Sequence, residues 1–141
     1  MKIETFGIVS NVKKKGISEV TSRVVSHVPD GIRIVALEDT AGLLEGSRVE
    51  TVDSLSGCDA VASLGGDGTF LRAARFVEQD EVPVLGIKIR SLGFLTEDDL
   101  DRAVTDLFAG KCRVQERMRL ECTVEDDADG TVFSALNDIV I

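Results

Sequence analysis

The residues best suited to chemistry in this chain lie in one glycine-rich turn, Gly65-Gly66-Asp67-Gly68-Thr69. An apolar run, Ala60 to Leu64, stops at the first glycine, and a helix-forming segment follows the turn directly. Glycines allow successive backbone amides to converge on an anion, and the positive end of the following helix adds to that attraction. Asp67 is the exception, because a phosphate repels a carboxylate unless that carboxylate accepts a proton or holds Mg²⁺. The turn therefore predicts phosphoryl-transfer chemistry.

This turn differs from the two best-known phosphate-binding patterns. It fits neither GxxxxGK[ST] nor GxGxxG, and no lysine stands where the first pattern has one. A purely structural alternative is a tight turn in which Asp67 or Thr69 caps the helix. The apolar strand that runs directly into the glycines favours the phosphate-binding interpretation.

The elements that must position this turn alternate between strands and helices. Short apolar runs bounded by turn residues predict strands, and apolar residues at helical spacing predict helices. The predicted strands are Phe6–Val9, Ile32–Ala36, Val61–Leu64 and Pro83–Ile87, and the predicted helices are Ile17–Val28, 38–46, Thr69–Val77 and Thr96–Phe108. This alternation predicts an α/β fold with a parallel sheet and helical crossovers.

Beyond Gly110 the pattern changes to one typical of antiparallel strands. The predicted strands and turn are Cys112–Gln115, Leu120–Val124, Asp127–Gly130 (the turn) and Thr131–Ile141. We place a domain boundary near Gly110, between an α/β domain at 1–110 that carries the glycine turn and the beginning of a strand-rich, mainly antiparallel second domain at 111–141. Because the sequence stops inside an apolar strand, we expect this second domain to be truncated.

Composition limits the partners of the chain. It has 25 acidic and 16 basic residues, a formal net charge of −9, and this balance argues against a nucleic-acid partner. No apolar run approaches the ~20 residues that a bilayer span needs. The N-terminus has no signal-peptide pattern, so we expect a cytoplasmic protein with no membrane partner. Cys58, Cys112 and Cys122 lack metal-ligand spacing and are interpreted as reduced thiols.

The glycine turn resembles the GGDGT signature of NAD kinases, diacylglycerol and sphingosine kinases and, with a changed last residue, phosphofructokinases. Further blocks resemble the NAD kinases specifically and occur in that family's order, namely Phe70–Arg75, Leu92–Thr96, Arg117–Leu120 and Ala135–Asp138. The chain departs from the usual Gly-Ile-Asn-x-Gly-x-Leu-Gly-Phe of the family, because Lys88 replaces the Asn and Arg90 replaces a Gly. A long cation at either position could fill part of the pocket or bind additional phosphate.

The resemblance implies a kinase that transfers a phosphoryl group from ATP or polyphosphate to the adenosine ribose 2′-hydroxyl of NAD. It implies Mg²⁺ as the cation that neutralises the phosphates, and a homo-oligomer for the full-length protein. By the same resemblance Asp67 would be the general base that accepts the hydroxyl proton. The nucleotide- and NAD-binding residues that it implies are Gly65, Gly66, Asp67, Gly68, Thr69, Arg72, Phe94, Asn137 and Asp138, and no protein metal ligand is assigned.

Two other interpretations stay open. One is a lipid kinase with the same glycine signature, although the block at 135–138 and the lack of a membrane-facing apolar signal favour NAD. The other is a non-catalytic or degenerate nucleotide-binding module, suggested by Lys88, Arg90 and the short second domain. NAD kinases continue past the Asn-Asp signature into a strand-rich domain that completes the NAD site. We therefore expect residues 1–141 alone to have little or no kinase activity.

Overall fold

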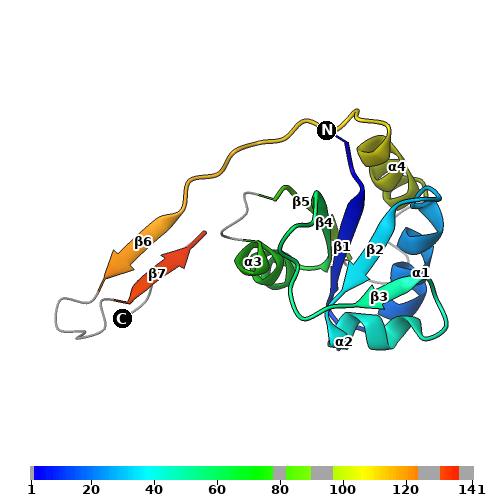
Figure 1. The fold of residues 1–141 in the computed structure, drawn as a ribbon, viewed down its shortest axis with the longest axis horizontal. Helices are drawn as coiled ribbons and strands as arrows, with labels where there is room; N and C mark the ends of the chain where they lie inside the picture. The colour runs from blue at the N-terminus through cyan, green and yellow to red at the C-terminus, as the bar shows by residue number, and fades with distance from the viewer. Residues whose placement is uncertain (1, 78–81, 90–96, 124–130, 137–141) are drawn as a thin grey trace.

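The computed structural model describes residues 2–77, 82–89, 97–123 and 131–136, and its main body is a five-stranded sheet (Figure 1). The strands lie in the order β3-β2-β1-β4-β5, and every neighbouring pair in this sheet is parallel. They are β1 (Thr5–Ser10), β2 (Arg33–Ala36), β3 (Val49–Thr51), β4 (Ala60–Gly65) and β5 (Val84–Lys88). The predicted parallel α/β fold is therefore confirmed.

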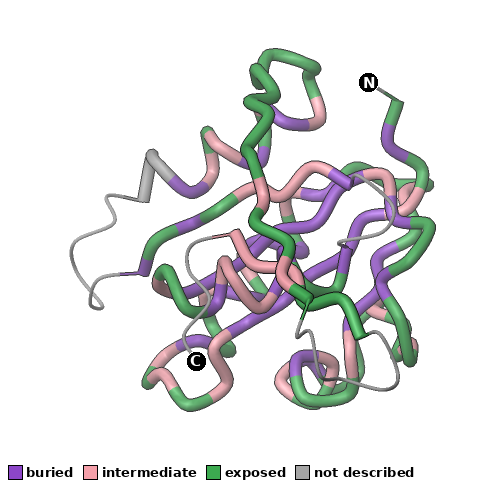
Figure 2. The backbone as a smooth tube through the Cα atoms, turned by 90° about the vertical axis from the view of Figure 1, so that its left-hand side faces the viewer, coloured by how far each residue is buried: buried purple, intermediate pink, exposed green. Residues whose placement is uncertain are grey.

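Helices pack against both faces of this sheet. They are α1 (Ile17–His27), α2 (Glu38–Ala41), α3 (Asp67–Phe76) and α4 (Glu97–Phe108), with a short 3-10 helix η1 (Gly42–Leu44) after α2. One apolar cluster joins α1 and α4 to strand residues such as Phe6 and Leu64, and a second joins α3 to others such as Val9 and Val61. Since successive strand residues point to opposite faces, β1 and β4 are buried on both sides, as their apolar runs predict (Figure 2).

Polar contacts fix α4 to α1. The guanidinium of Arg23 donates two hydrogen bonds to the Asp101 carboxylate, with N–O distances of 2.9 and 2.8 Å. His27 lies on the same carboxylate, with Nε2 3.4 Å from Oδ1. The hydrogen bond from Arg23 lowers the pKa of Asp101 below its usual value. The charged pair thus holds together two helices that are far apart in the sequence.

The structure corrects the predicted elements at three places. β3 is absent from the sequence prediction, because it is a three-residue strand at the edge of the sheet, with Glu50 at its centre and little burial. The predicted helix at 38–46 consists of two shorter pieces, α2 and η1. The predicted strand Cys112–Gln115 is wrong, since this exposed segment forms no strand although its residues alternate in polarity. Alternation predicts a strand only where a neighbouring strand satisfies the backbone.

The second unit, where the structure describes it, is a pair of antiparallel strands. They are β6 (Leu120–Thr123) and β7 (Val132–Ala135). Gly110, near which the domain boundary was placed, adopts a φ of +68° and ends the preceding helical region, and its amide donates to the carbonyl of Leu107. An extended segment then leads to the β6–β7 pair, which lies to one side of the sheet, beyond α3 (Figure 1). The antiparallel start of this unit is confirmed, whereas the predicted turn Asp127–Gly130 lies outside the described residues.

Candidate active site

The glycine turn lies at the point where the sheet changes its direction of winding. From β1 the chain crosses to β2 on one side, and from β4 it crosses to β5 on the other, while β1 and β4 are neighbours. Open α/β sheets bind ligands in the crevice at the carboxyl ends of two such strands. A cavity of about 290 Å³ is found there, lined by Ser10, Asn11, Val12, Lys13, Gly66, Gly68, Thr69 and Arg72. We call it the switch-point cavity.

The three glycines of the turn allow close packing at Gly65 and leave the backbone open at Gly66 and Gly68, and they do not adopt unusual backbone angles. A Cβ atom at Gly65 would lie 2.2 Å from Thr69 Oγ1 and 3.2 Å from Asn11 Cβ, so no side chain fits there. At Gly66 and Gly68 a Cβ would meet nothing within 4 Å, so these two glycines leave the backbone uncovered. None of the three has a positive φ. The convergence of amides that was expected of the glycines therefore does not come from backbone angles that favour glycine.

Helix α3 presents its N-terminus to this cavity. It begins at Asp67, two residues before the predicted start at Thr69, and Gly66 is its N-cap. The amides of Thr69 and Phe70 both donate to the carbonyl of Gly66, at 3.0 and 3.1 Å, and this pairing starts the helix early. No side chain caps the helix, so the structural alternative of an Asp67 or Thr69 cap is excluded. The positive end of a ten-residue helix is left to attract an anion.

Asp67 stands between the switch-point cavity and a second one. Its neighbours Gly66 and Gly68 line the first, whereas its own side chain lines a cavity of about 520 Å³. That second cavity is bounded by Asp67, Phe70, Leu71, Arg117, Met118 and Leu136, and we call it the carboxylate cavity. The Asp67 side chain is 87% exposed, so a bound molecule can reach it. This arrangement allows one molecule to place a phosphate over the turn while another brings a hydroxyl group to the carboxylate.

Arg72 lies one turn into α3, on the rim of the switch-point cavity, where the resemblance implies phosphate contact. Its guanidinium pairs with the Asp39 carboxylate of α2 at 2.5 Å and lies over the Phe76 ring, 5.3 Å from the ring centre. These contacts fix the side chain at the rim, and Asp39 offsets part of its charge. Arg72 is therefore placed near the cavity but already has an anionic partner.

The sequence analysis raised Lys88 as a cation that could fill part of the pocket or bind phosphate, but it did not include Lys88 among the site residues or pair it with Asp67. It is the last residue of β5 and pairs in register with Gly65. Its Nζ atom lies 3.4 Å from Oδ1 of Asp67. The signal was available in the sequence, because residues at the carboxyl ends of neighbouring parallel strands meet at one edge of the sheet. Lys13, which follows β1 and lines the switch-point cavity, could have been found in the same way.

The remaining predicted site residues, Phe94, Asn137 and Asp138, lie outside the described residues. Leu136, the residue before Asn137, lines the carboxylate cavity. Among the residues that the structure describes, no group of three or more His, Cys, Asp or Glu side chains could hold a metal ion. No helix in that part of the chain is both long and apolar enough to cross a bilayer.

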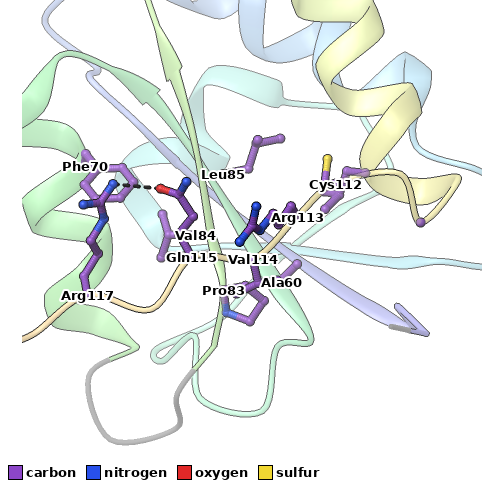
Figure 3. A pocket seen from close by; sticks show the side chains of 12 residues that line it. Ala60, Phe70, Pro83, Val84, Leu85, Cys112, Arg113, Val114, Gln115 and Arg117 are labelled. Carbon is purple, nitrogen blue, oxygen red and sulfur yellow. Dashed lines mark hydrogen bonds between the residues drawn. The ribbon is translucent and has the colours of Figure 1, made fainter.

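A third cavity, of about 330 Å³, adjoins the carboxylate cavity (Figure 3). Phe70 and Arg117 line both of them. Its floor includes Val84 and Leu85 of β5, and its opposite wall is the extended segment that follows α4. Within that wall, Arg117 Nη2 donates to Gln115 Oε1 at 2.8 Å. The segment predicted as a strand therefore serves as a wall of the pocket region.

The fold and the turn together define a doubly wound α/β domain, with a helix N-terminus and uncovered glycines at its switch point. The sequence model described as the ATP-NAD kinase N-terminal domain matches residues 6–110, which is most of the chain. The chain belongs to the NAD kinase family. The resemblance that the four sequence blocks suggested is thereby confirmed.

Individual relatives agree with this assignment. The chain is 33% identical to an NAD kinase of Moorella thermoacetica over 99% of its own length and 46% of the relative's. It is 36% identical to an NAD kinase of Heliobacterium modesticaldum, over 97% and 50% of the two lengths. The chain thus spans about half the length of the curated relatives that it matches. The crystal structure of yeast NADH kinase complexed with NADH shares the fold, with a TM-score of 0.78, 20% identity and coverage of 96% of this chain and 45% of the other.

Proposed function

We propose that this chain supplies the N-terminal part of an NAD kinase, which makes NADP from NAD with ATP or polyphosphate as donor. The observation that carries the proposal is the position of Asp67, an exposed carboxylate between two cavities at the switch point of a NAD kinase family fold. The donor phosphates would lie over the uncovered backbone of Gly66 and Gly68. The acceptor ribose would lie in the carboxylate cavity.

In this arrangement the adenosine ribose 2′-oxygen attacks the terminal phosphorus of the donor. A new oxygen–phosphorus bond forms, and the bond to the bridging oxygen breaks, so that its electron pair leaves with ADP or with the shortened polyphosphate. Asp67 accepts the proton of the attacking hydroxyl. The protein contributes mainly positioning and charge stabilisation, as in other phosphoryl transfers. The N-terminus of α3 and Lys13 are placed to stabilise the charge of the donor phosphates.

We propose Mg²⁺ as the metal that accompanies the donor. Proteins usually hold this ion through one or two carboxylates together with substrate phosphates and water. Asp67 is the one carboxylate among the described residues that line the two cavities, and it is the proposed base, so the ion would be held mainly by the donor phosphates and water. Bound in this way, Mg²⁺ would neutralise phosphate charge during the transfer.

A second candidate function is a nucleotide-binding module without catalysis. It is favoured by one observation, the ion pair between Lys88 and Asp67, which engages the proposed base. Such a module would bind NAD and would not turn it over. The same experiment tests both candidates.

The test is the substitution Asp67→Asn in the protein as encoded, with NADP formation as the assay. General-base catalysis is typically worth about 10²–10⁴-fold, so we expect kcat to fall by about that factor. NAD binding measured by calorimetry should stay within about threefold, because the amide keeps the shape of the side chain. The matched control is Asp30→Asn, since Asp30 is fully exposed and contacts only the surface residue Arg48, at 3.6 Å, in the ion pairs that the structure describes. A fall of less than about tenfold would exclude Asp67 as the base, and NAD binding by an inactive wild-type protein would favour the binding module.

A further inference from the structure

Lys88 places a positive charge next to the proposed base. It ends β5, in register with Gly65, so its side chain begins beside the glycine turn. The four-carbon stem brings the ammonium within 3.4 Å of the Asp67 carboxylate.

The ion pair between Lys88 and Asp67 can break, so that each side chain can take another partner. The two side chains are 54% and 87% exposed, and exposed ion pairs contribute little to folding stability. A lysine ammonium is a compact charge on a flexible stem, which suits a group that changes partners. A polyanionic phosphate that arrives over the turn competes with the carboxylate for this ammonium. The pair is therefore available for function at small cost to the fold.

The other cations of the region are differently placed. Lys13 and Arg72 line the switch-point cavity, and Arg72 is held by Asp39 at 2.5 Å. Lys88 approaches from β5, on the opposite side of β4 from β1 and Lys13. Arg117 lines the carboxylate cavity and donates to Gln115, whereas the Lys88 ammonium lies 3.4 Å from the Asp67 carboxylate itself.

We propose that Lys88 is a catalytic residue that binds the phosphoryl group in transfer. In the free protein it pairs with Asp67, and when the substrates bind, its ammonium turns to the oxygens of the moving phosphoryl group. Asp67 is then released to accept the hydroxyl proton, while Lys88 stays protonated throughout. The next strand, rather than the turn, thus supplies the phosphate-binding lysine that the glycine turn lacks. This inference rests on the proposed kinase function.

The experiment compares Lys88→Met and Lys88→Arg in the protein as encoded, with Lys111→Met as the matched control. Lys111 is an exposed lysine three residues after α4 whose ion-pair partner in the structure is Asp106, at 3.9 Å, rather than Asp67. Removal of one charge-stabilising group from a transition state typically lowers kcat by about 10²–10³-fold, and we expect that range for Lys88→Met. We expect KM for NAD to change by less than about threefold, because the lost contact is to the phosphoryl group of the donor and not to NAD. Lys88→Arg, which keeps the charge, should restore about tenfold or more of the lost kcat.

A second readout does not depend on turnover. Tripolyphosphate, used as a substitute for the donor's phosphates, should bind about tenfold more weakly to Lys88→Met and unchanged to Lys111→Met in calorimetry. If wild-type protein made no NADP, the kinase function would fail, and this binding difference would by itself support or overturn the role of Lys88. Turnover by Lys88→Met at or above the wild-type rate would overturn the proposal, because Lys88 would then restrain the base. A loss of kcat without weaker tripolyphosphate binding and without rescue by Lys88→Arg would also overturn it, because Lys88 would then only position Asp67.

Discussion

Substitution of Gly65 by alanine should destabilise the fold, because the added Cβ atom would lie too close to side-chain atoms of Thr69 and Asn11. The added Cβ would lie 2.2 Å from Thr69 Oγ1, 2.8 Å from Thr69 Cβ and 3.2 Å from Asn11 Cβ. Thr69 is buried in the first turn of α3, so it cannot move aside without shifting the helix. Overpacking of this kind typically costs about 1–3 kcal/mol. Alanine also reduces the entropy of the unfolded chain, worth about 0.4–1 kcal/mol in the other direction.

The net loss expected for Gly65→Ala is therefore about 1–2 kcal/mol of unfolding free energy. The neighbouring substitution Gly66→Ala is the matched control, because a Cβ there meets nothing within 4 Å and the residue has a φ of −104° that alanine readily adopts. Its gain in entropy and its loss of a favourable N-cap glycine should cancel to within about 0.5 kcal/mol. The chain has no Trp or Tyr, so urea unfolding is best followed by far-ultraviolet circular dichroism. With a slope of about 2 kcal/mol per molar urea, the midpoint for Gly65→Ala should fall by about 0.5–1 M.

A double variant tests the cause of this loss. Thr69→Ala removes the Oγ1 atom that makes the shortest contact, so the pair Gly65→Ala and Thr69→Ala should show a favourable coupling of about 1 kcal/mol. Equal stability of Gly65→Ala and Gly66→Ala would refute the reasoning. So would a strong loss with no coupling to Thr69, since the close approach to this side chain would then not be the source of the strain.

Two further predictions concern the helix contacts and the pocket. Because the hydrogen bond from Arg23 lowers the folded-state pKa of Asp101, this pair stabilises the protein above the usual carboxylate pKa, and the stabilisation is lost as pH falls through the lowered value. Asp101→Asn should therefore lower the melting temperature at pH 7 and reduce its decline on acidification below about pH 4, and an unchanged decline would contradict the assignment. Gly86→Ala should push the Phe70 ring, whose Cδ2 atom would lie 2.9 Å from the new Cβ, toward the two cavities that it lines. We expect KM for NAD to rise about three- to tenfold in steady-state assays, whereas an unchanged KM would show that this ring does not border the acceptor.

Sequence patterns predicted those elements whose burial is uniform. β1 and β4 are covered on both faces, so their apolar runs were unambiguous, and the stripe of Leu100, Val104 and Leu107 located α4. β3 escaped prediction because three residues at a sheet edge leave almost no periodic signal. Cys112–Gln115 was wrongly predicted as a strand because polarity alternation does not reveal whether a pairing partner exists.

The candidate site was predicted only in part, for a related reason. The glycine turn was evident because its signals are local in the sequence. The contact of Lys88 with Asp67 and that of Arg72 with Asp39 join residues 21 and 33 positions apart, and strand order determines them. The requirement for glycine at position 65 was not predicted, because it comes from the close approach of Thr69 in the first turn of α3 and not from the backbone angle of the glycine itself.

The extended segment after α4 connects the pocket region to the β6–β7 pair. Arg117 borders two cavities from this segment, and Arg119 Nη2 donates to the carbonyl of Ala74 in α3 at 3.1 Å. A ligand bound between α3 and this segment would oppose a displacement of β6. A displacement of β6 would weaken the binding of that ligand by the same coupling free energy. A partner that pulled on the β6–β7 pair would therefore change ligand binding through this segment and through Leu136, which follows β7 and lines the carboxylate cavity.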